Sequence, residues 1–267
     1  MTKQEFIQIV RNLLDPNQDP APNQTLLFMF ESTIEAAYHN AIVLDQYNFD
    51  VHAAISAQSD SLVMFGSEFK HPDKLQKLLE DHPRWEHLKQ ILLTGATFPL
   101  KPISPADRLM DLEFHLQRGN HQSATRHKAI PNKLITDDIK GFALPLPIQL
   151  YKYLPNASIA PLGCHEQETI NEAGDRIPKF RMTHNQSFPG LSGQSVNLTV
   201  EKDQAPPCMY SFVLSRVLHY IVDVCRHHPD KKIFLCKFNL DSAYRHCHLS
   251  GLTASWCMVT SSLWLSV

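Results

Sequence analysis

The stretch Lys231-Lys-Ile-Phe-Leu-Cys-Lys-Phe-Asn-Leu-Asp-Ser-Ala-Tyr-Arg-His246 is the most informative part of the chain. Its side chains alternate in polarity, which is typical of a strand whose two faces meet different surroundings. One face is apolar and the other is mainly polar: Phe234, Cys236, Phe238 and Leu240 on the first, and Lys237, Asn239 and Asp241 with Ile233 and Leu235 on the second. The pattern predicts a strand that runs into a short turn or helix. Its polar end is a candidate site, and the alternative is a half-buried strand that leaves its sheet for solvent.

Composition indicates a folded chain of one or two domains. The 267 residues are 43% hydrophobic and 19% charged, which is enough to bury a sizeable core. The net charge is −2, so no overall field favours nucleic acid. The charge is unevenly placed, however, because residues 1–173 hold 15 Lys+Arg against 21 Asp+Glu, whereas residues 174–267 hold 10 against 6. The positive excess therefore lies in the part that contains the opening stretch.

Cysteine spacing and hydropathy bear on the compartment. The six cysteines form no Cys-x-x-Cys pair, which favours a reducing environment. The first residues, Met1-Thr-Lys-Gln-Glu, are polar and do not resemble a secretory signal. No apolar run approaches the roughly 18 residues that a membrane span needs. We therefore expect an intracellular protein, in the cytoplasm or the nucleus, that is not secreted and has no membrane partner.

Helical periodicity dominates the first 120 residues. Capping residues, early prolines and apolar spacing predict helices over Thr2–Leu14, Leu26–Leu44, a short segment from Asp50, Pro72–Leu79, Pro83–Leu93 and a segment from Ser104 that Gly119 ends. The apolar stripe of the first helix is Phe6, Ile9, Val10 and Leu13. We expect residues 1–120 to form a helical N-terminal region.

The remaining residues mix short strands with one long helix. Residues 119–127 are polar and predict a solvated loop, and residues 158–164 can form a strand. In Ile177–His184, Lys179 and Arg181 fall on one face and Phe180 on the other, which predicts a strand with two exposed cations. Residues 209–227 predict an amphipathic helix with these core residues: Phe212, Leu214, Val217, Leu218, Ile221, Val222 and Val224.

Three kinds of chemistry are compatible with these patterns. Lys179 and Arg181 are candidates for phosphate contacts, Arg181 through a bidentate fork, although a solvated strand face is the alternative. Cys225-Arg-His-His228 and His246-Cys-His248 supply zinc-ligand types without the usual spacing. A Cys–His nucleophilic pair has no identifiable turn to carry it. Residues 190–195 lack the Gly-Lys-Ser/Thr of a P-loop.

Three segments together resemble one known family. Residues 179–188 (Lys-Phe-Arg-Met-Thr-His-Asn-Gln-Ser-Phe), 192–197 (Ser-Gly-Gln-Ser-Val-Asn) and 237–245 (Lys-Phe-Asn-Leu-Asp-Ser-Ala-Tyr-Arg) resemble, in order and spacing, the reverse transcriptases of retrotransposons. The resemblance implies an α+β fold, with a helical N-terminal region followed by an incomplete fingers and palm domain. Residues 121–250 would then hold the fingers and the first palm strand, and residues 251–267 would be a divergent tail.

The resemblance also implies roles for individual residues. Lys179 and Arg181 would lie over the triphosphate of the incoming nucleotide. Leu240, Ala243 and Tyr244 would complete the nucleotide-binding set, with Leu240 offering a carbonyl near the metals and Tyr244 rejecting a ribose 2′-hydroxyl. The partners would be an RNA or DNA template-primer and a dNTP, and the cofactor would be a pair of Mg²⁺ ions.

The departures from the family concern the catalytic residues. Asn239 stands where the first catalytic carboxylate is expected, and it brings no charge to Mg²⁺. Asp241 is the candidate metal ligand, but along a strand it would lie about 6–7 Å further on. The Tyr-x-Asp-Asp turn of the second palm motif is missing, and no Asp follows Asp241. We expect a truncated, inactive reverse transcriptase. The alternatives are a non-enzymatic nucleic-acid-binding or protein-interaction module, and an unrelated helical enzyme.

Overall fold

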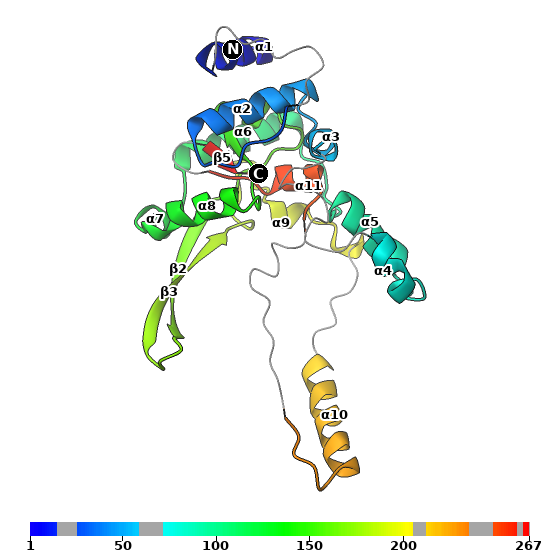
Figure 1. Ribbon diagram of the computed structural model, residues 1–267. Coiled ribbons are helices and arrows are strands. Elements are labelled where there is room, and N and C mark those ends of the chain that lie inside the picture. The colour runs from blue at the N-terminus through cyan, green and yellow to red at the C-terminus, as the bar shows by residue number, and fades with distance from the viewer. Residues whose placement is uncertain (15–25, 59–71, 205–211, 235–247, 261–263, 267) are drawn as a thin grey trace.

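The computed structural model describes residues 1–14, 26–58, 72–204, 212–234, 248–260 and 264–266 (Figure 1). Its helices are α1 (Lys3–Leu14), α2 (Ile34–Gln46), α3 (Val51–Ser56), α4 (Pro72–Leu79), α5 (Trp85–Thr94), α6 (Pro105–Arg118), α7 (Gln122–Thr125), α8 (Ala129–Ile139), α9 (Val196–Thr199), α10 (Val213–His227) and α11 (Gly251–Trp256), with short 3₁₀ turns η1 (Ile148–Lys152) and η2 (Lys202–Gln204). Its strands are β1 (Pro145–Pro147), β2 (Leu162–Ile170), β3 (Arg176–His184), β4 (Val259–Thr260) and β5 (Trp264–Ser266). The mixture of helices with small sheets confirms the α+β class.

The capping box predicted for α1 is present. The Thr2 amide donates to Glu5 Oε2 at 2.7 Å, and the Glu5 amide donates to Thr2 Oγ1 at 3.2 Å. The stripe is shifted from the prediction, because α1 buries Phe6, Ile7 and Val10 against α2 while Ile9 and Leu13 are exposed. The helix lies where the pattern predicted it, but its contact with α2 decides which of its faces is buried.

The predicted helix over Leu26–Leu44 is wrong in its first turns. Thr33 caps α2 by accepting a hydrogen bond from the Ala36 amide, so the helix begins at Ile34. The preceding segment is irregular, and the buried side-chain amides of Gln58 and Asn40 hold it in place. Gln58 binds the Phe28 amide and the Leu26 carbonyl, and Asn40 binds both backbone groups of Met29. These side-chain partners replace the backbone bonds that a longer helix would have made.

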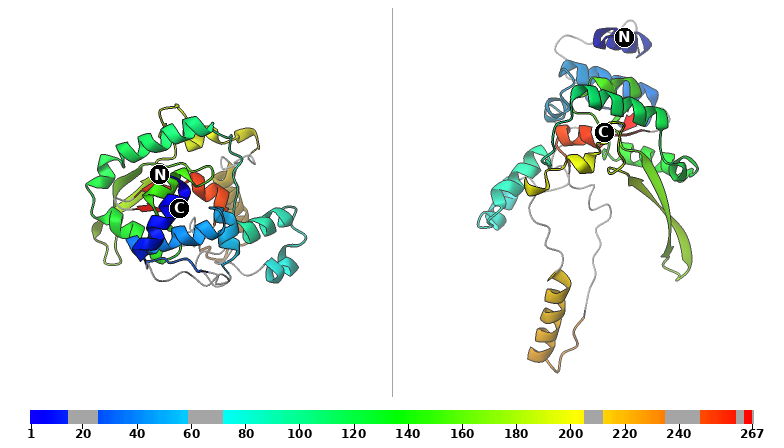
Figure 2. Two further views of the ribbon diagram at one scale, coloured as in Figure 1. Left: turned by 90° about the horizontal axis from the view of Figure 1, so that it is seen from above. Right: turned by 180° about the vertical axis from the view of Figure 1, so that it is seen from behind.

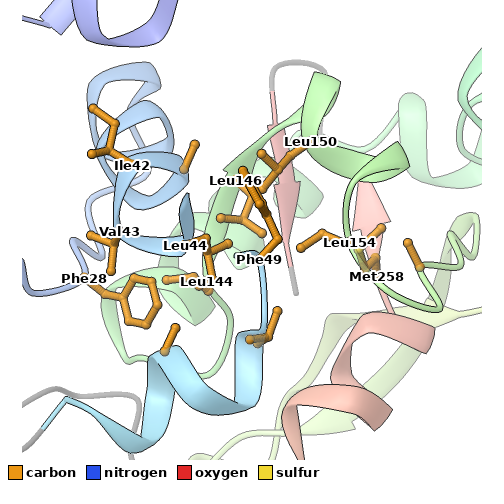
Figure 3. Packing of buried hydrophobic residues seen from close by; sticks show 14 of the residues in the cluster. Phe28, Ile42, Val43, Leu44, Phe49, Leu144, Leu146, Leu150, Leu154 and Met258 are labelled. Carbon is orange, nitrogen blue, oxygen red and sulfur yellow. The ribbon is translucent and has the colours of Figure 1, made fainter. Parts of the chain in front are cut away.

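The main hydrophobic core brings together segments that are far apart in the sequence (Figure 3). It joins α1, α2 and α3 to η1, the residues around β1 and the segment after α11, and its members include Phe6, Val43, Leu44, Phe49, Leu146, Leu150, Leu154 and Met258. Strand β5 pairs with both β1 and β4 to form the three-stranded sheet. The packing therefore crosses the predicted boundary at residue 120 and includes residues of the predicted tail.

A second unit, the hairpin of β2 and β3, extends from this body (Figure 1). The predicted strand at 177–184 is present as β3. The strand predicted at residues 158–164 starts later, because Ile159 makes only an isolated bridge to Met258 and regular pairing begins at Leu162. The turn is closed by Asn171, whose side-chain oxygen accepts from the Asp175 amide at 2.8 Å. Both strands are nine residues long, so the distal half reaches beyond α7 and α8 (Figure 2).

The predicted amphipathic helix is confirmed as α10, but its predicted burial is not observed. No side chain of α10 is buried, and the large apolar ones are mostly exposed: Phe212, Leu214, Val217, Leu218 and Val222. Ile221 and Val224 are half-buried. The views show α10 standing clear of the other described elements (Figures 1 and 2). The amphipathic pattern predicted the helix correctly. It did not show whether another element would cover the apolar side of that helix.

Candidate nucleic-acid interface

The register of the hairpin places two cations on one face. His165 is opposite Arg181, and Gln167 is opposite Lys179. Directly opposed residues of an antiparallel pair share a face, and so do residues two apart along a strand. We call this surface the cationic face; its eight positions are Gly163, His165, Gln167, Thr169, Ile177, Lys179, Arg181 and Thr183. None of the eight is acidic, and Lys179 and Arg181 are both exposed.

Nothing within the described chain neutralises these two cations. Neither Lys179 nor Arg181 lies within 4.0 Å of a carboxylate in the described residues, whereas Arg176 pairs with Glu168 at 3.1 Å. Arg176 and Glu168 are on the opposite face of the hairpin. The α-carbons of Lys179 and Arg181 are about 7 Å apart along an extended strand. The arrangement provides two adjacent donors, one of them a guanidinium, for a multiply charged anion.

The opposite face of the hairpin attaches it to the body. Cys164 and Met182 pack against a small apolar cluster that includes Ile130 and Leu134 of α8. Further out, the ring of Phe180 lies 4.6 Å from the ring of His127. These contacts are made by the opposite face, and they leave Lys179 and Arg181 exposed. The predicted separation of Phe180 from Lys179 and Arg181 is confirmed.

The segment before α7 fastens the root of the hairpin. Asn120 accepts from the Leu162 amide at 2.8 Å and donates to the Thr260 carbonyl at 2.8 Å, so it joins β2 to β4. The His121 amide donates to the Leu162 carbonyl at 2.9 Å, and Ser123 Oγ accepts from the Cys164 amide at 3.2 Å. Residues 119–127 were predicted as a solvated loop, which is wrong, because they form a short helix and the attachment of the hairpin.

A cluster of two imidazoles, one guanidinium and one phenyl ring lies beside this root. The guanidinium of Arg118 lies over the ring of Phe188 at 4.1 Å, and the ring centroids of His115 and His121 lie 5.8 and 5.4 Å from that of Phe188 in T-shaped arrangements. Nδ1 of His121 lies 3.3 Å from the Arg118 guanidinium, and Nε2 lies 3.1 Å from the Asn185 side-chain amide. Since Arg118 only donates, Nδ1 of His121 must accept.

Both imidazoles have a lowered pKa, which favours their neutral form. Burial lowers the pKa of His115, with Arg118 acting in the same direction and Asp111 opposing it. Burial also lowers the pKa of His121, and the neighbouring Arg118 lowers it further. A proton on either ring would add a second positive charge beside Arg118 in a partly buried place. The surroundings of both rings therefore favour their uncharged form.

The loop after β3 is clamped to α6 by one buried carboxylate. Oδ1 of Asp111 accepts from the Ser192 amide at 2.8 Å, and Oδ2 accepts from Ser192 Oγ at 2.5 Å. Gly190 has no room for a side chain, because a Cβ there would lie 2.2 Å from the Asp111 carboxyl group. Beside this clamp is a cavity of about 20 Å³ lined by both apolar and polar residues, among them His115, whose buried Nδ1 has no partner in the described chain. The 190–195 segment, which lacks a P-loop, is thus a structural turn around an internal carboxylate.

Five of the predicted site residues lie outside the described residues. These are Asn239, Leu240, Asp241, Ala243 and Tyr244, together with most of the predicted strand at 233–241. The predicted Mg²⁺ contact at Asp241 is therefore still a prediction. Within the described ranges there is no group of three or more His, Cys, Asp or Glu that could hold a metal ion. Of the zinc-ligand candidates, Cys225 and His228 belong to α10 and its C-cap, and residues 246 and 247 lie outside the described part.

Several residues that organise this region were not predicted. Asp111 and His115 occur one turn apart on α6, where a mixed helix surface was the only visible pattern. Asn120 and His121 follow the helix stop at Gly119, and their polarity suggested solvent rather than a buried attachment. Gly190 and Ser192 suggest a turn, but no local pattern identifies Asp111 as its partner, because Asp111 and Ser192 are 81 residues apart.

Comparisons with known proteins returned nothing on which to base a family. No protein-family profile matches the chain, and neither a curated protein nor a solved structure is significantly similar to it. In the described part of the chain, no helix has both the length and the hydropathy required to cross a bilayer.

Proposed function

We propose that this chain is a reverse transcriptase-like protein that binds the phosphates of RNA or DNA through the cationic face of the β2–β3 hairpin. The observation that carries the proposal is the pairing of Lys179 with Arg181 on a projecting, acid-free face, unneutralised by any described carboxylate. Phosphate oxygens are bound preferentially by such Arg and Lys groups. In the family that the sequence resembles, these two positions contact a nucleotide triphosphate, and the template-primer and dNTP are the proposed partners.

The position of the resemblance motifs supports the same proposal. Residues 185–188 and 192–197 follow β3, and Asn185 contacts His121 from the segment before α7. The cationic face is thus fixed to α6 and α7 through Asn185, Phe188 and Ser192. A phosphate-binding hairpin needs this kind of support, because a contact of two side chains is weakened when its platform moves.

The test is fluorescence anisotropy with a fluorescein-labelled 20-nucleotide single-stranded RNA and the matching DNA, at 50 and 200 mM KCl. We expect weak, salt-sensitive binding, and we expect the double variant Lys179→Gln/Arg181→Gln to lower the slope of log K against log salt by about 2. Arg176→Gln is the matched control, because Arg176 lies on the other face of the same hairpin and is paired with Glu168. Equal losses of affinity in the double variant and the control, or an affinity that does not change with salt concentration, would rule out binding of nucleic acid at the cationic face.

Catalytic activity is tested separately. We expect that these 267 residues will not extend a DNA primer on an RNA template with Mg²⁺, because Asn239 stands where the resemblance expects a catalytic carboxylate and the sequence contains no Tyr-x-Asp-Asp. Template-dependent incorporation that disappears in Asp241→Ala would show that the chain is an active polymerase.

A further inference from the structure

Hydrogen bonds at the root of the hairpin identify which backbone groups of β2 point away from β3. The amide and carbonyl of Leu162 bond outward to Asn120 and His121, and the amide of Cys164 bonds outward to Ser123. Outward and inward backbone groups alternate along an antiparallel strand. The backbone amides and carbonyls of the even-numbered residues of β2 therefore point away from β3. Beyond Cys164 these residues are Glu166, Glu168 and Ile170.

These three residues form a free strand edge. All three are exposed, and nothing in the described chain bonds to their outward amides and carbonyls. The hairpin carries them beyond α7 and α8, as the two side views show (Figures 1 and 2). We call the outward backbone groups of Glu166, Glu168 and Ile170 the β2 edge. An exposed row of unpaired amides and carbonyls is a template for an added strand.

The other edge of the hairpin is blocked. Pro178 is directly opposite Glu168, so the backbone groups of Pro178 also point away from the partner strand, at the centre of the outer edge of β3. Proline has no amide hydrogen and interrupts any added ladder. Only the β2 edge thus offers consecutive donors and acceptors.

The charge of β2 selects the partner. Glu166 and Glu168 lie on one face, and β2 contains no Lys or Arg, although Glu168 already pairs with Arg176 of β3, so Glu166 is the unpaired acid of the two in the described chain. A second copy of this chain is disfavoured, because two-fold antiparallel pairing about Gln167 or Glu168 sets one glutamate opposite another. We propose that the β2 edge binds, as an added antiparallel strand, an extended segment of a partner protein whose alternate residues are Lys or Arg. This inference goes beyond the proposed contact with nucleic acid and does not depend on it.

The test uses nuclease-treated protein and a fluorescein-labelled octapeptide of alternating Lys and Val. In the proposed pairing the Lys residues stand opposite Glu166 and Glu168, so their amides donate to the β2 edge. We expect N-methylation of the Lys amides to weaken binding at least tenfold. N-methylation of the Val amides, which point away from β2, is the matched control and should change binding less than twofold.

Two further measurements locate the contact. Glu166→Lys should weaken the unmodified peptide about fivefold, since it replaces an attractive cross-strand pair by a repulsive one, whereas the remote control Glu86→Lys should not. On peptide binding, hydrogen exchange should slow at the amides of Glu166, Glu168 and Ile170. No binding at 1 mM peptide, equal binding of the two methylated peptides, or protection elsewhere would each overturn the proposal.

Discussion

The clamp between Asp111 and Ser192 makes the strongest stability prediction. Replacing Asp111 by Ala removes two hydrogen bonds to a buried carboxylate, at 2.8 and 2.5 Å, and leaves both Ser192 donors without their acceptor. Hydrogen bonds to charged groups contribute about 1.5–3 kcal/mol each, but Ser192 is half-buried and water can recover part of the loss, so we expect about 2–3 kcal/mol in total. For a chain of this size the midpoint of thermal unfolding should fall by about 5–10 °C.

The assay is urea unfolding followed by circular dichroism, arranged as a double-mutant cycle. Ser192→Ala removes only the hydroxyl contact and should cost about 1 kcal/mol, and the double variant should cost about 1 kcal/mol less than the sum of the two. Glu113→Ala, an exposed acid on the same helix, is the control and should change the free energy of unfolding by less than about 0.5 kcal/mol. Additive single effects, or a cost of Asp111→Ala no larger than that of the control, would refute the clamp.

Three other predictions concern the same region and one half-buried thiol. Gly190→Ala should destabilise the fold by about 1–3 kcal/mol, because the added Cβ meets the α6 carboxylate, whereas Gly174→Ala at the open hairpin turn meets no atom within 4 Å and suffers only backbone strain. The pKa values of His115 and His121 are lowered in the folded state, so their contribution to stability should be complete above about pH 6.5 and should be lost as the pH falls through the folded-state values. Replacing both residues by Gln should reduce the slope of the free energy of unfolding against pH in that range, and an unchanged slope would contradict the prediction. Burial raises the pKa of Cys257 to about 11, so iodoacetamide at pH 8 should label it far more slowly than the exposed Cys225, as peptide mass spectrometry can show.

Local sequence patterns were sufficient for most helices of the chain. The box of Thr2 and Glu5, the cap at Ser104 and the stop at Gly119 each act within a few residues, so their meaning does not depend on the rest of the fold. The start of α2 could not be predicted in this way. Its boundary depends on Gln58, which binds the Leu26–Phe28 segment from 30 or more residues away.

The candidate site was predictable only in part for the same reason. Alternation along one strand was enough to place Lys179 and Arg181 together, because both belong to β3. It could not show that Asn120, His121 and Asn185 anchor the hairpin, since those contacts join segments about 40 to 140 residues apart. The sequence also could not show that the apolar side of α10 would be exposed. Helical periodicity predicts which side of a helix is apolar, but not which other element packs against that side.

The core joins the two ends of the chain, and this has a consequence for how the protein is made. Phe6 and Met258 belong to one apolar cluster, and Pro145 of β1 pairs with Ser266 of β5. During synthesis, α1 and α2 therefore emerge long before the residues that complete their packing. Contacts so distant along the chain fold slowly, and apolar surface that waits for its partner is prone to aggregate. The nascent chain should depend on chaperones until the segment around Met258 has left the ribosome.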